Sequence, residues 1–253
     1  MRTKVEIVFR RKVRCIWLDQ GLSLAAQGVL WSEAKPVLAK EIAAENSGAV
    51  TVSKVLEHIR RIWFEPPDDA LALRADALSL HHADASSGTT FLLNWGMMIA
   101  AYPFIGSAAE ALGRLLKLQN EALREDVQRR LREQYGDRDF VNRVARYTVS
   151  SFLDWGVIVE TRQRGVYQPT KPIWSNSGGG LAWLAEAVMI SCRKTQVPFS
   201  ELCNHPALFP IAMDTLNASV LLSNPRLRVE RQSLNQLFVF LSVASVPKPS
   251  INK

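Results

Sequence analysis

The chain has 253 residues, a formal net charge of +7 and a sequence pI of about 9.5. Its composition, 47% hydrophobic and 22% charged, allows a sizeable packed core and excludes a chain that is disordered throughout. The basic balance favours a polyanionic partner over an acidic or neutral one. The three cysteines are too widely spaced for a disulfide framework, so we expect a reducing compartment. They are Cys15, Cys192 and Cys203.

Residues 1–90 are predicted to form a helical region. Helical periodicity extends over 20–65, and the pair Pro66-Pro67 ends it because proline lacks the amide hydrogen that a helix needs. Residues 68–80 predict another short helix. The polar loop 81–90 is then the best internal boundary in the first half of the chain.

The first 14 residues form a basic arm, with six Lys or Arg against one Glu. The alternation in VEIVF is also compatible with a short strand. Cations on such an arm either bind phosphate groups or simply face solvent, and both interpretations stay open. The candidate contacts are Arg10, Arg11, Lys12 and Arg14.

The most apolar stretch is FLLNWGMMIAAYPFI, residues 91–105. At 15 residues, with Asn94 and Pro103 inside it, this stretch is too short to span a bilayer and predicts a buried helix. The N-terminal sequence lacks the apolar segment of a secretion signal. We therefore expect a cytoplasmic protein with no membrane partner.

After this buried helix, three more helices and a hairpin are predicted up to residue 174. After a break at Pro103 and Gly106, Ser107 opens a capping box that starts a helix over 107–118. Asn120 is the predicted cap of a second helix over 121–135, and a third helix covers 139–155. Two strands, VIVET and VYQPT, follow it. This order of elements is that of a winged helix-turn-helix domain.

The third helix has two distinct faces. The apolar stripe recurs at helical spacing and is expected to be buried: Val141, Val144, Ala145, Thr148, Phe152 and Trp155. The opposite stripe is polar: Asp139, Asn142, Arg143, Arg146 and Ser150. In winged helices this exposed face lies in the DNA major groove, where arginine suits guanine and phosphate and asparagine suits adenine.

The predicted hairpin has a basic tip, RQRG. Gly156 can adopt positive φ and end the helix, and Arg162 and Arg164 would then reach phosphate or the minor groove. Between Arg114 and Lys171 the chain has twelve Lys or Arg and eight Asp or Glu, so much of the basic excess lies here. Winged helices also serve as protein-docking modules, and the eight acids keep that alternative open.

The last part of the chain is predicted to be helical after a linker. SNSGGG, residues 175–180, has the composition of a linker, and residues 181–253 then form a C-terminal helical region with a second helix near 208–222. The segment 226–241 is ambiguous, since RLRVE alternates like a strand. The predicted units are thus 1–90, 91–174, 175–180 and 181–253.

Motifs for catalysis or metal binding are weak. Cys192, Cys203 and His205 lack the spacing of a zinc site, and GGG is not followed by the residues of a phosphate-binding loop. Asp19, Glu33 and Lys35 have the outline of a magnesium-dependent nuclease site, but their segment is helical. We therefore expect no cofactor, no metal, no small-molecule substrate and no catalytic residue, with a nuclease as the remaining enzymatic alternative.

The segment WGMMIAAYPFIGSAAEALGRLLKLQNEALREDVQRRLREQYGDRDFVNRVARYTVSSFLDWGVI, residues 95–158, resembles the BrxA family of bacterial BREX phage-defence systems. The likeness lies in an apolar helix before a short break, then a winged helix that ends in a Trp-Gly transition to the wing. The resemblance implies a non-enzymatic DNA-binding protein with helix-turn-helix units at both ends of the chain.

The sequence as a whole predicts a mainly α protein with a helical N-terminal part, a central winged helix-turn-helix with a short β-hairpin wing, and a helical C-terminal part. The function predicted first is binding of double-stranded DNA as an accessory protein of phage defence. One alternative is an adaptor that docks other subunits of a defence or regulatory complex through the winged helix, and another is a transcriptional regulator.

Overall fold

The computed structural model of the chain describes residues 9–45, 48–174, 178–233 and 236–242. These residues form eleven α-helices, six short strands and a few π- and 3₁₀-helical turns, so the prediction of a mainly helical protein is confirmed. Most of the predicted basic arm before Phe9, part of the predicted linker and the C-terminal tail lie outside the described residues.

The first helical run of the N-terminal part ends at Pro66-Pro67, as the sequence predicts. They are α1 (Cys15–Ala26), α2 (Trp31–Glu45), α3 (Ala49–Ile59) with a π-helical extension (Arg60–Phe64), a 3₁₀ turn (Asp68–Ala70) and α4 (Leu71–Ala83). The helical run stops before Pro66-Pro67, because neither proline can donate a helical hydrogen bond.

The polar loop predicted over 81–90 is much shorter in the structure. Its first residues belong to α4, and its last belong to α5 (Ser87–Ala101). Ser86 begins α5 because its hydroxyl accepts a hydrogen bond from the Thr89 amide at 3.4 Å, and the Asp84 carboxylate accepts one from the Thr89 hydroxyl at 2.5 Å. The side chains of a polar segment thus cap a helix and shorten the loop.

Helix α6 (Pro103–Gln119) follows α5 after a sharp bend of 115°. The predicted start at a Ser107 capping box is wrong, because Pro103 takes the first helical position, where its missing amide hydrogen costs nothing. The Ser107 hydroxyl instead bonds the Tyr135 hydroxyl at 2.7 Å. In the described part of the chain no single helix is long and apolar enough to cross a membrane, although α5 and α6 pass that test as a bent pair.

A small antiparallel sheet accompanies the next two helices. After α6 come β1 (Ala122–Leu123), α7 (Arg124–Tyr135), α8 (Asp139–Asp154), β2 (Ile158–Glu160) and β3 (Val166–Pro169). The strand order is β1-β3-β2, so the last strand lies in the middle. Asn120 does not cap α7 as predicted, because it ends α6 in the left-handed region at φ 57° and β1 intervenes. Gly156, at φ 68°, turns the chain from α8 toward β2 as predicted.

The predicted helical C-terminal part is wrong in its second half. After α9 (Gly178–Cys192) the chain forms β4 (Gln196–Pro198), α10 (Phe199–Cys203), a 3₁₀ turn (Pro206–Leu208), α11 (Ala218–Leu221), β5 (Leu227–Ser233) and β6 (Gln236–Leu241). The single helix expected near 208–222 is replaced by short turns and α11. Residues 178–180 of the expected linker begin α9.

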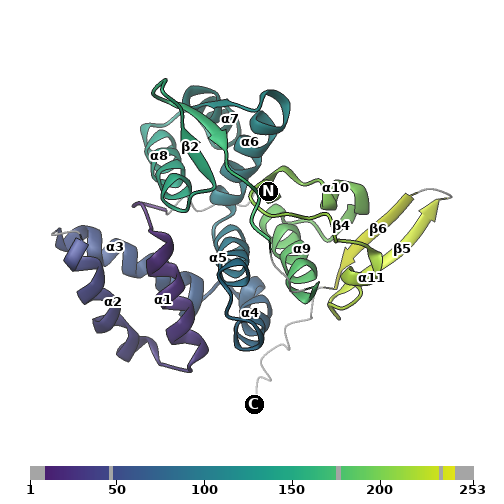
Figure 1. Cartoon of the computed structure of the whole chain (residues 1–253), viewed down its shortest axis with the longest axis horizontal. Coiled ribbons are helices and arrows are strands. Elements are labelled where there is room, and N and C mark those ends of the chain that lie inside the picture. Colours follow the sequence, from purple (N-terminus) through teal and green to yellow (C-terminus); the bar gives the residue numbers. More distant parts are fainter. Residues whose placement is uncertain (1–8, 46–47, 175–177, 234–235, 243–253) are drawn as a thin grey trace, which may run out of the picture.

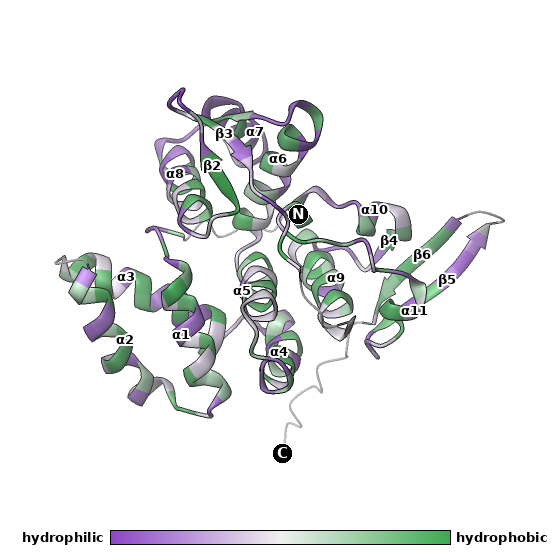
Figure 2. Cartoon of the chain, in the orientation of Figure 1, coloured by the Kyte–Doolittle hydropathy of each residue, from purple (hydrophilic) through white to green (hydrophobic). Residues whose placement is uncertain are grey.

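The hairpin β5–β6 explains why the segment 226–241 is ambiguous in sequence. Leu227 is buried while Arg228 and Glu230 are exposed, which is the alternation of a strand with one covered face. Figure 2 shows the contrast between a hydrophilic β5 and a hydrophobic β6. The strand order of this sheet is β4-β6-β5, which repeats the order of the first sheet.

The other elements form three groups that lie around α5 (Figure 1). Helices α1–α3 lie on one side of it, α6–α8 with β2 above it, and α9 with the second sheet on the other side. Gly96 of α5 permits direct packing on α9, since a Cβ there would lie 2.3 Å from the Trp183 ring. One continuous apolar core extends through all three groups, and it includes five of the seven tryptophans.

Candidate nucleic-acid interface

Helix α8 has the two faces that its sequence predicts. The predicted apolar stripe is buried throughout: Val141, Val144, Ala145, Thr148, Phe152 and Trp155. On the opposite face Arg143 and Arg146 are exposed, and Ser150 is half-buried. Among the described residues neither arginine forms an ion pair. Both guanidinium groups are therefore available to an external partner.

Asn142 is more constrained than its neighbours on α8. Its side-chain oxygen accepts a hydrogen bond from an Arg132 guanidinium nitrogen of α7 at 3.3 Å. Recognition of adenine by asparagine uses the amide oxygen and nitrogen together. A bidentate contact from Asn142 to a base would therefore require Arg132 to move.

The hairpin β2–β3 is held in shape by Arg124. Its guanidinium donates to the Tyr167 hydroxyl at 2.9 Å and to the Glu160 carboxylate at 3.2 Å, and Glu160 also accepts from the Gly165 amide at 2.6 Å. Arg162 and Arg164 at the tip are exposed and make no ion pair within the described ranges. Figure 2 shows that this tip is hydrophilic. One arginine thus supports the hairpin, and two project from it.

The two C-terminal cations of the basic arm are paired inside the protein. Lys12 and Arg14 contact a single carboxylate oxygen of Asp154, at 2.8 and 3.1 Å. Arg14 also pairs with Glu45. The other Asp154 oxygen accepts the Cys15 amide at 3.1 Å. Lys12 and Arg14 therefore attach the arm to the end of α8 and are largely neutralised.

Arg10 and Arg11 lie along α8 instead. The Arg10 guanidinium lies 6.0 Å from the centroid of the Phe140 ring, and that of Arg11 lies 5.7 Å from the Tyr147 ring. Arg143 is three residues after Phe140 and four before Tyr147, so these three residues are neighbours on one face of the helix. The structure thus brings Arg10 and Arg11 beside the exposed arginines of α8.

The arm is anchored by long-range contacts that sequence patterns did not predict. The Arg10 amide donates to His58 Nε2 at 3.1 Å, and His58 Nδ1 bonds the Tyr102 hydroxyl at 2.8 Å. The Val13 amide donates to the Ser151 hydroxyl at 3.0 Å, and the Trp155 indole donates to the Val13 carbonyl at 2.9 Å. These contacts join residues far apart in sequence, so helical periodicity carries no signal for them.

The residues of the nuclease alternative do not share a site. The Asp19 carboxylate accepts a hydrogen bond from the Asn94 amide of α5 at 2.6 Å, and burial raises its pKa. Lys35 instead lines a separate cavity of about 640 Å³ between α2 and α3. Glu33 is exposed in the first turn of α2. Asp19 and Lys35 of the predicted trio therefore line different cavities.

Among the described residues, the candidate interface consists of the exposed face of α8, the basic tip of the β2–β3 hairpin and the arm that is attached to α8. No family model, no curated protein and no solved structure matches this chain.

Proposed function

We propose that the chain is a non-enzymatic cytoplasmic protein that binds double-stranded DNA through a winged helix formed by residues 103–169. The order of elements supports this proposal, since two helices joined by a short turn, α7 and α8, are followed by a hairpin. The strand β1 that precedes α7 pairs with β3, which places the hairpin against the helices. In such a domain α8 is the recognition helix and β2–β3 is the wing.

The observation that carries the proposal is the set of cations that no internal acid neutralises. Arg143 and Arg146 on α8, and Arg162 and Arg164 on the wing, are exposed without ion pairs in the residues that the structure describes. Elsewhere in the unit Arg114, Arg124 and Arg129 each pair with an acid. Lys117, Arg130 and Arg138 of the unit also form no ion pair among the described residues, so the four arginines are the part of this unpaired basic charge that lies where a winged helix contacts DNA.

The proposed binding mode assigns each group a role. Helix α8 enters the major groove, where Arg143 and Arg146 reach guanine edges or phosphates. Arg162 and Arg164 contact the adjacent backbone or the minor groove. Arg10 and Arg11 extend the basic face along the flank of α8. Lys12 and Arg14 contribute little, because Asp154 and Glu45 together already neutralise them.

The test is a gel-shift titration of the full chain with a DNA duplex over a range of salt concentrations. Each phosphate contact adds about 0.9 to the slope of log affinity against log salt. We expect clear binding at about 50 mM salt, and Arg143→Ala/Arg146→Ala should weaken it and lower the slope by up to about 2. Arg162→Ala/Arg164→Ala should have a similar effect.

The matched control is Lys35→Ala/Lys40→Ala, which removes the same charge from the exposed face of α2. It should bind DNA as tightly as the wild type. Absence of a shift at about 50 mM salt contradicts DNA binding itself. Binding that is unchanged in both arginine variants contradicts the assigned interface but not DNA binding.

One observation favours the adaptor alternative, in which the same unit docks a protein. Three large apolar side chains of this unit are exposed: Leu118 by 75%, Leu123 by 41% and Val159 by 47%. Exposed apolar groups typically lie at protein interfaces when they form one patch. This alternative predicts a partner that stays bound at high salt and no shift of DNA. Sequence-specific binding would instead favour a transcriptional regulator.

The resemblance to the BrxA family leads us to propose a role in bacterial phage defence. The strand order β4-β6-β5 repeats the order β1-β3-β2, but these sheets belong to the central and the C-terminal unit, whereas the resemblance implies helix-turn-helix units at both ends of the chain. The C-terminal unit has only short helices, α10 and α11, so we assign DNA binding to the central unit. Deletion of the gene should increase phage sensitivity if the proposal holds.

A further inference from the structure

Three side chains with metal-binding chemistry meet between the central unit and the C-terminal unit. They are Glu110 of α6, Cys192 at the end of α9 and His205 just before the 3₁₀ turn. A ligand atom from each lies within 4.8 Å of the other two, and the Cys192 sulfur is 3.4 Å from His205 Nε2. All three line a cavity of about 250 Å³.

Two glycines of α6 explain why these groups come together. A Cβ on Gly106 would lie 2.0 Å from the Ser191 hydroxyl, and a Cβ on Gly113 would lie 2.0 Å from the Pro206 carbonyl oxygen. Glu110 is four residues after Gly106 and three before Gly113, so all three lie on one face of α6. The close approach at each glycine brings Cys192 and His205 to the carboxylate between them.

We propose that Glu110, Cys192 and His205 form a binding site for a thiophilic divalent cation such as Zn²⁺. Zinc takes thiolate, imidazole and carboxylate ligands, and three protein ligands with one open position are a common arrangement. In a tetrahedral site the sulfur and nitrogen ligands are about 3.6 Å apart, close to the observed separation. The cavity provides space for a water molecule or small ligand in the fourth position.

The Glu110 carboxylate is already oriented by its neighbour. One of its oxygens accepts two hydrogen bonds from the Arg114 guanidinium, at 2.5 and 3.2 Å. The second oxygen is then the one assigned to the cation. The Glu110 side chain is 29% exposed, so a rotation of its terminal bonds can shorten the distance to the metal without repacking the core.

Metal binding must change the protonation of His205. The Ala207 amide donates to His205 Nδ1 at 3.3 Å, so the neutral ring carries its proton on Nε2, toward the Cys192 sulfur. When the cation binds, the thiol proton leaves to solvent and the imidazole proton transfers from Nε2 to Nδ1. The ring stays neutral, and the long contact with the Ala207 amide opens.

The test uses the full chain and Co²⁺ as a spectroscopic probe of thiolate ligation. We expect a thiolate-to-cobalt charge-transfer band in the near ultraviolet, which Zn²⁺ abolishes by competition. Cys192→Ser should lose the band. Cys203→Ser is the matched control, since Cys203 is another half-buried cysteine outside the cluster, and this variant should keep it.

The other two ligands are tested by affinity. Glu110→Gln and His205→Gln should each weaken Zn²⁺ binding by more than the roughly 10- to 100-fold that loss of a hydrogen bond to a ligand costs. The absence of a band in the wild type, or a band that survives Cys192→Ser, overturns the proposal. No DNA enters this experiment, so its outcome is separate from that of the gel-shift titration.

A measurement on the wild type makes the test independent of whether the variants fold. In NMR spectra of the labelled protein, the Ala207 amide should shift on addition of Zn²⁺, because its contact with Nδ1 opens. An unchanged Ala207 amide at saturating Zn²⁺ contradicts the ligand role of His205.

Discussion

His58 is the residue on which the path of the N-terminal arm depends. It is 2% exposed and packs against both the Phe9 ring, at 4.7 Å, and the Tyr102 ring, at 5.5 Å. Because Nε2 accepts from the Arg10 amide, the neutral ring carries its proton on Nδ1 and donates it to Tyr102. A second proton would remove the acceptor that holds Arg10.

We expect His58 to make the stability of the protein depend on pH below neutrality. Burial, aided by the nearby cations Lys54 and Arg10, lowers the pKa of His58 from 6.5 to about 3. In this pH range the imidazole of His58 binds a proton in the unfolded chain but not in the folded chain. The free energy of unfolding therefore decreases as the pH falls from 6.5 toward 3. The slope should approach about 1.4 kcal/mol per pH unit.

Urea unfolding between pH 6.5 and about 5, above the range in which most carboxylates titrate, measures this slope. His58→Gln should flatten it, whereas His82→Gln, which removes an exposed imidazole from α4, should leave it unchanged. Equal slopes in His58→Gln and the wild type would show that another group is responsible. His81 and His205 also have lowered pKa values and contribute with the same sign.

At the scale of elements, the arm and α8 behave as one unit. Asp154 is the last residue of α8, where a negative charge is unfavourable next to the helix carbonyl groups. It is offset by Lys12, by Arg14 and by the Cys15 amide, which all contact its carboxylate. The cations of the arm thus compensate a helix end that would otherwise carry an unpaired, nearly buried acid.

Asp154→Ala should therefore release the arm from α8. The Cys15 amide loses its acceptor, and the loss of a buried hydrogen-bond partner costs about 1–3 kcal/mol. We expect a lower free energy of unfolding and faster hydrogen exchange of the amides around Val13 and Cys15. Asp137→Ala, at a side chain that is 87% exposed, is the control. Unchanged exchange in Asp154→Ala would mean that Ser151 and Trp155 suffice to hold the arm.

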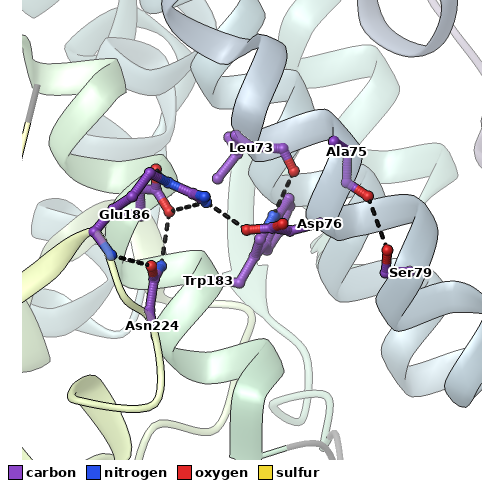
Figure 3. A network of polar contacts seen from close by, with 8 residues as sticks. Leu73, Ala75, Asp76, Ser79, Trp183, Glu186 and Asn224 are labelled. Atoms are coloured by element: carbon purple, nitrogen blue, oxygen red, sulfur yellow. Dashed lines mark hydrogen bonds and ion pairs between the residues drawn. The ribbon is translucent and has the colours of Figure 1, made fainter. Parts of the chain in front are cut away.

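At the scale of the whole molecule, one ion network joins the N-terminal helices to the C-terminal sheet (Figure 3). Arg226 donates to both oxygens of Glu186, at 2.7 and 2.8 Å, and also to Asp76 of α4. Asn224 donates to Glu186 at 2.7 Å. The Glu186 side chain is only 3% exposed, so its charge depends on these partners.

Arg226→Met should leave the Glu186 carboxylate buried without a cation. Removal of one partner of a buried ion pair costs about 3–5 kcal/mol, and we expect a loss of this order in urea unfolding. The double variant Arg226→Met/Glu186→Gln should recover much of it, because it removes the buried charge as well. Arg228→Ala, at a side chain that is 63% exposed, is the control. A loss in Arg226→Met no larger than in this control would contradict the role of the network.

Several features of the candidate interface were predictable from sequence alone. The faces of α8 follow from the recurrence of Val141, Val144 and Thr148 at helical spacing. The strands after Gly156 follow from alternation and from a residue that tolerates positive φ. The breaks in helical structure predicted at Pro66 and Pro103 are also confirmed. The hairpin at 226–241 was only half predictable, since β6 also pairs with β4, which is distant in sequence.

The sequence by itself determined the end of the N-terminal helical run at Pro66-Pro67 and which side of α8 is polar, because these properties depend on neighbours within a few turns of the chain. Only the tertiary structure decided which cations remain free. It paired Lys12 and Arg14 with Asp154 and left Arg143 and Arg146 exposed. Contacts between distant segments fix these pairings, and their energies depend on burial and on distances of a few ångströms, which no local pattern encodes.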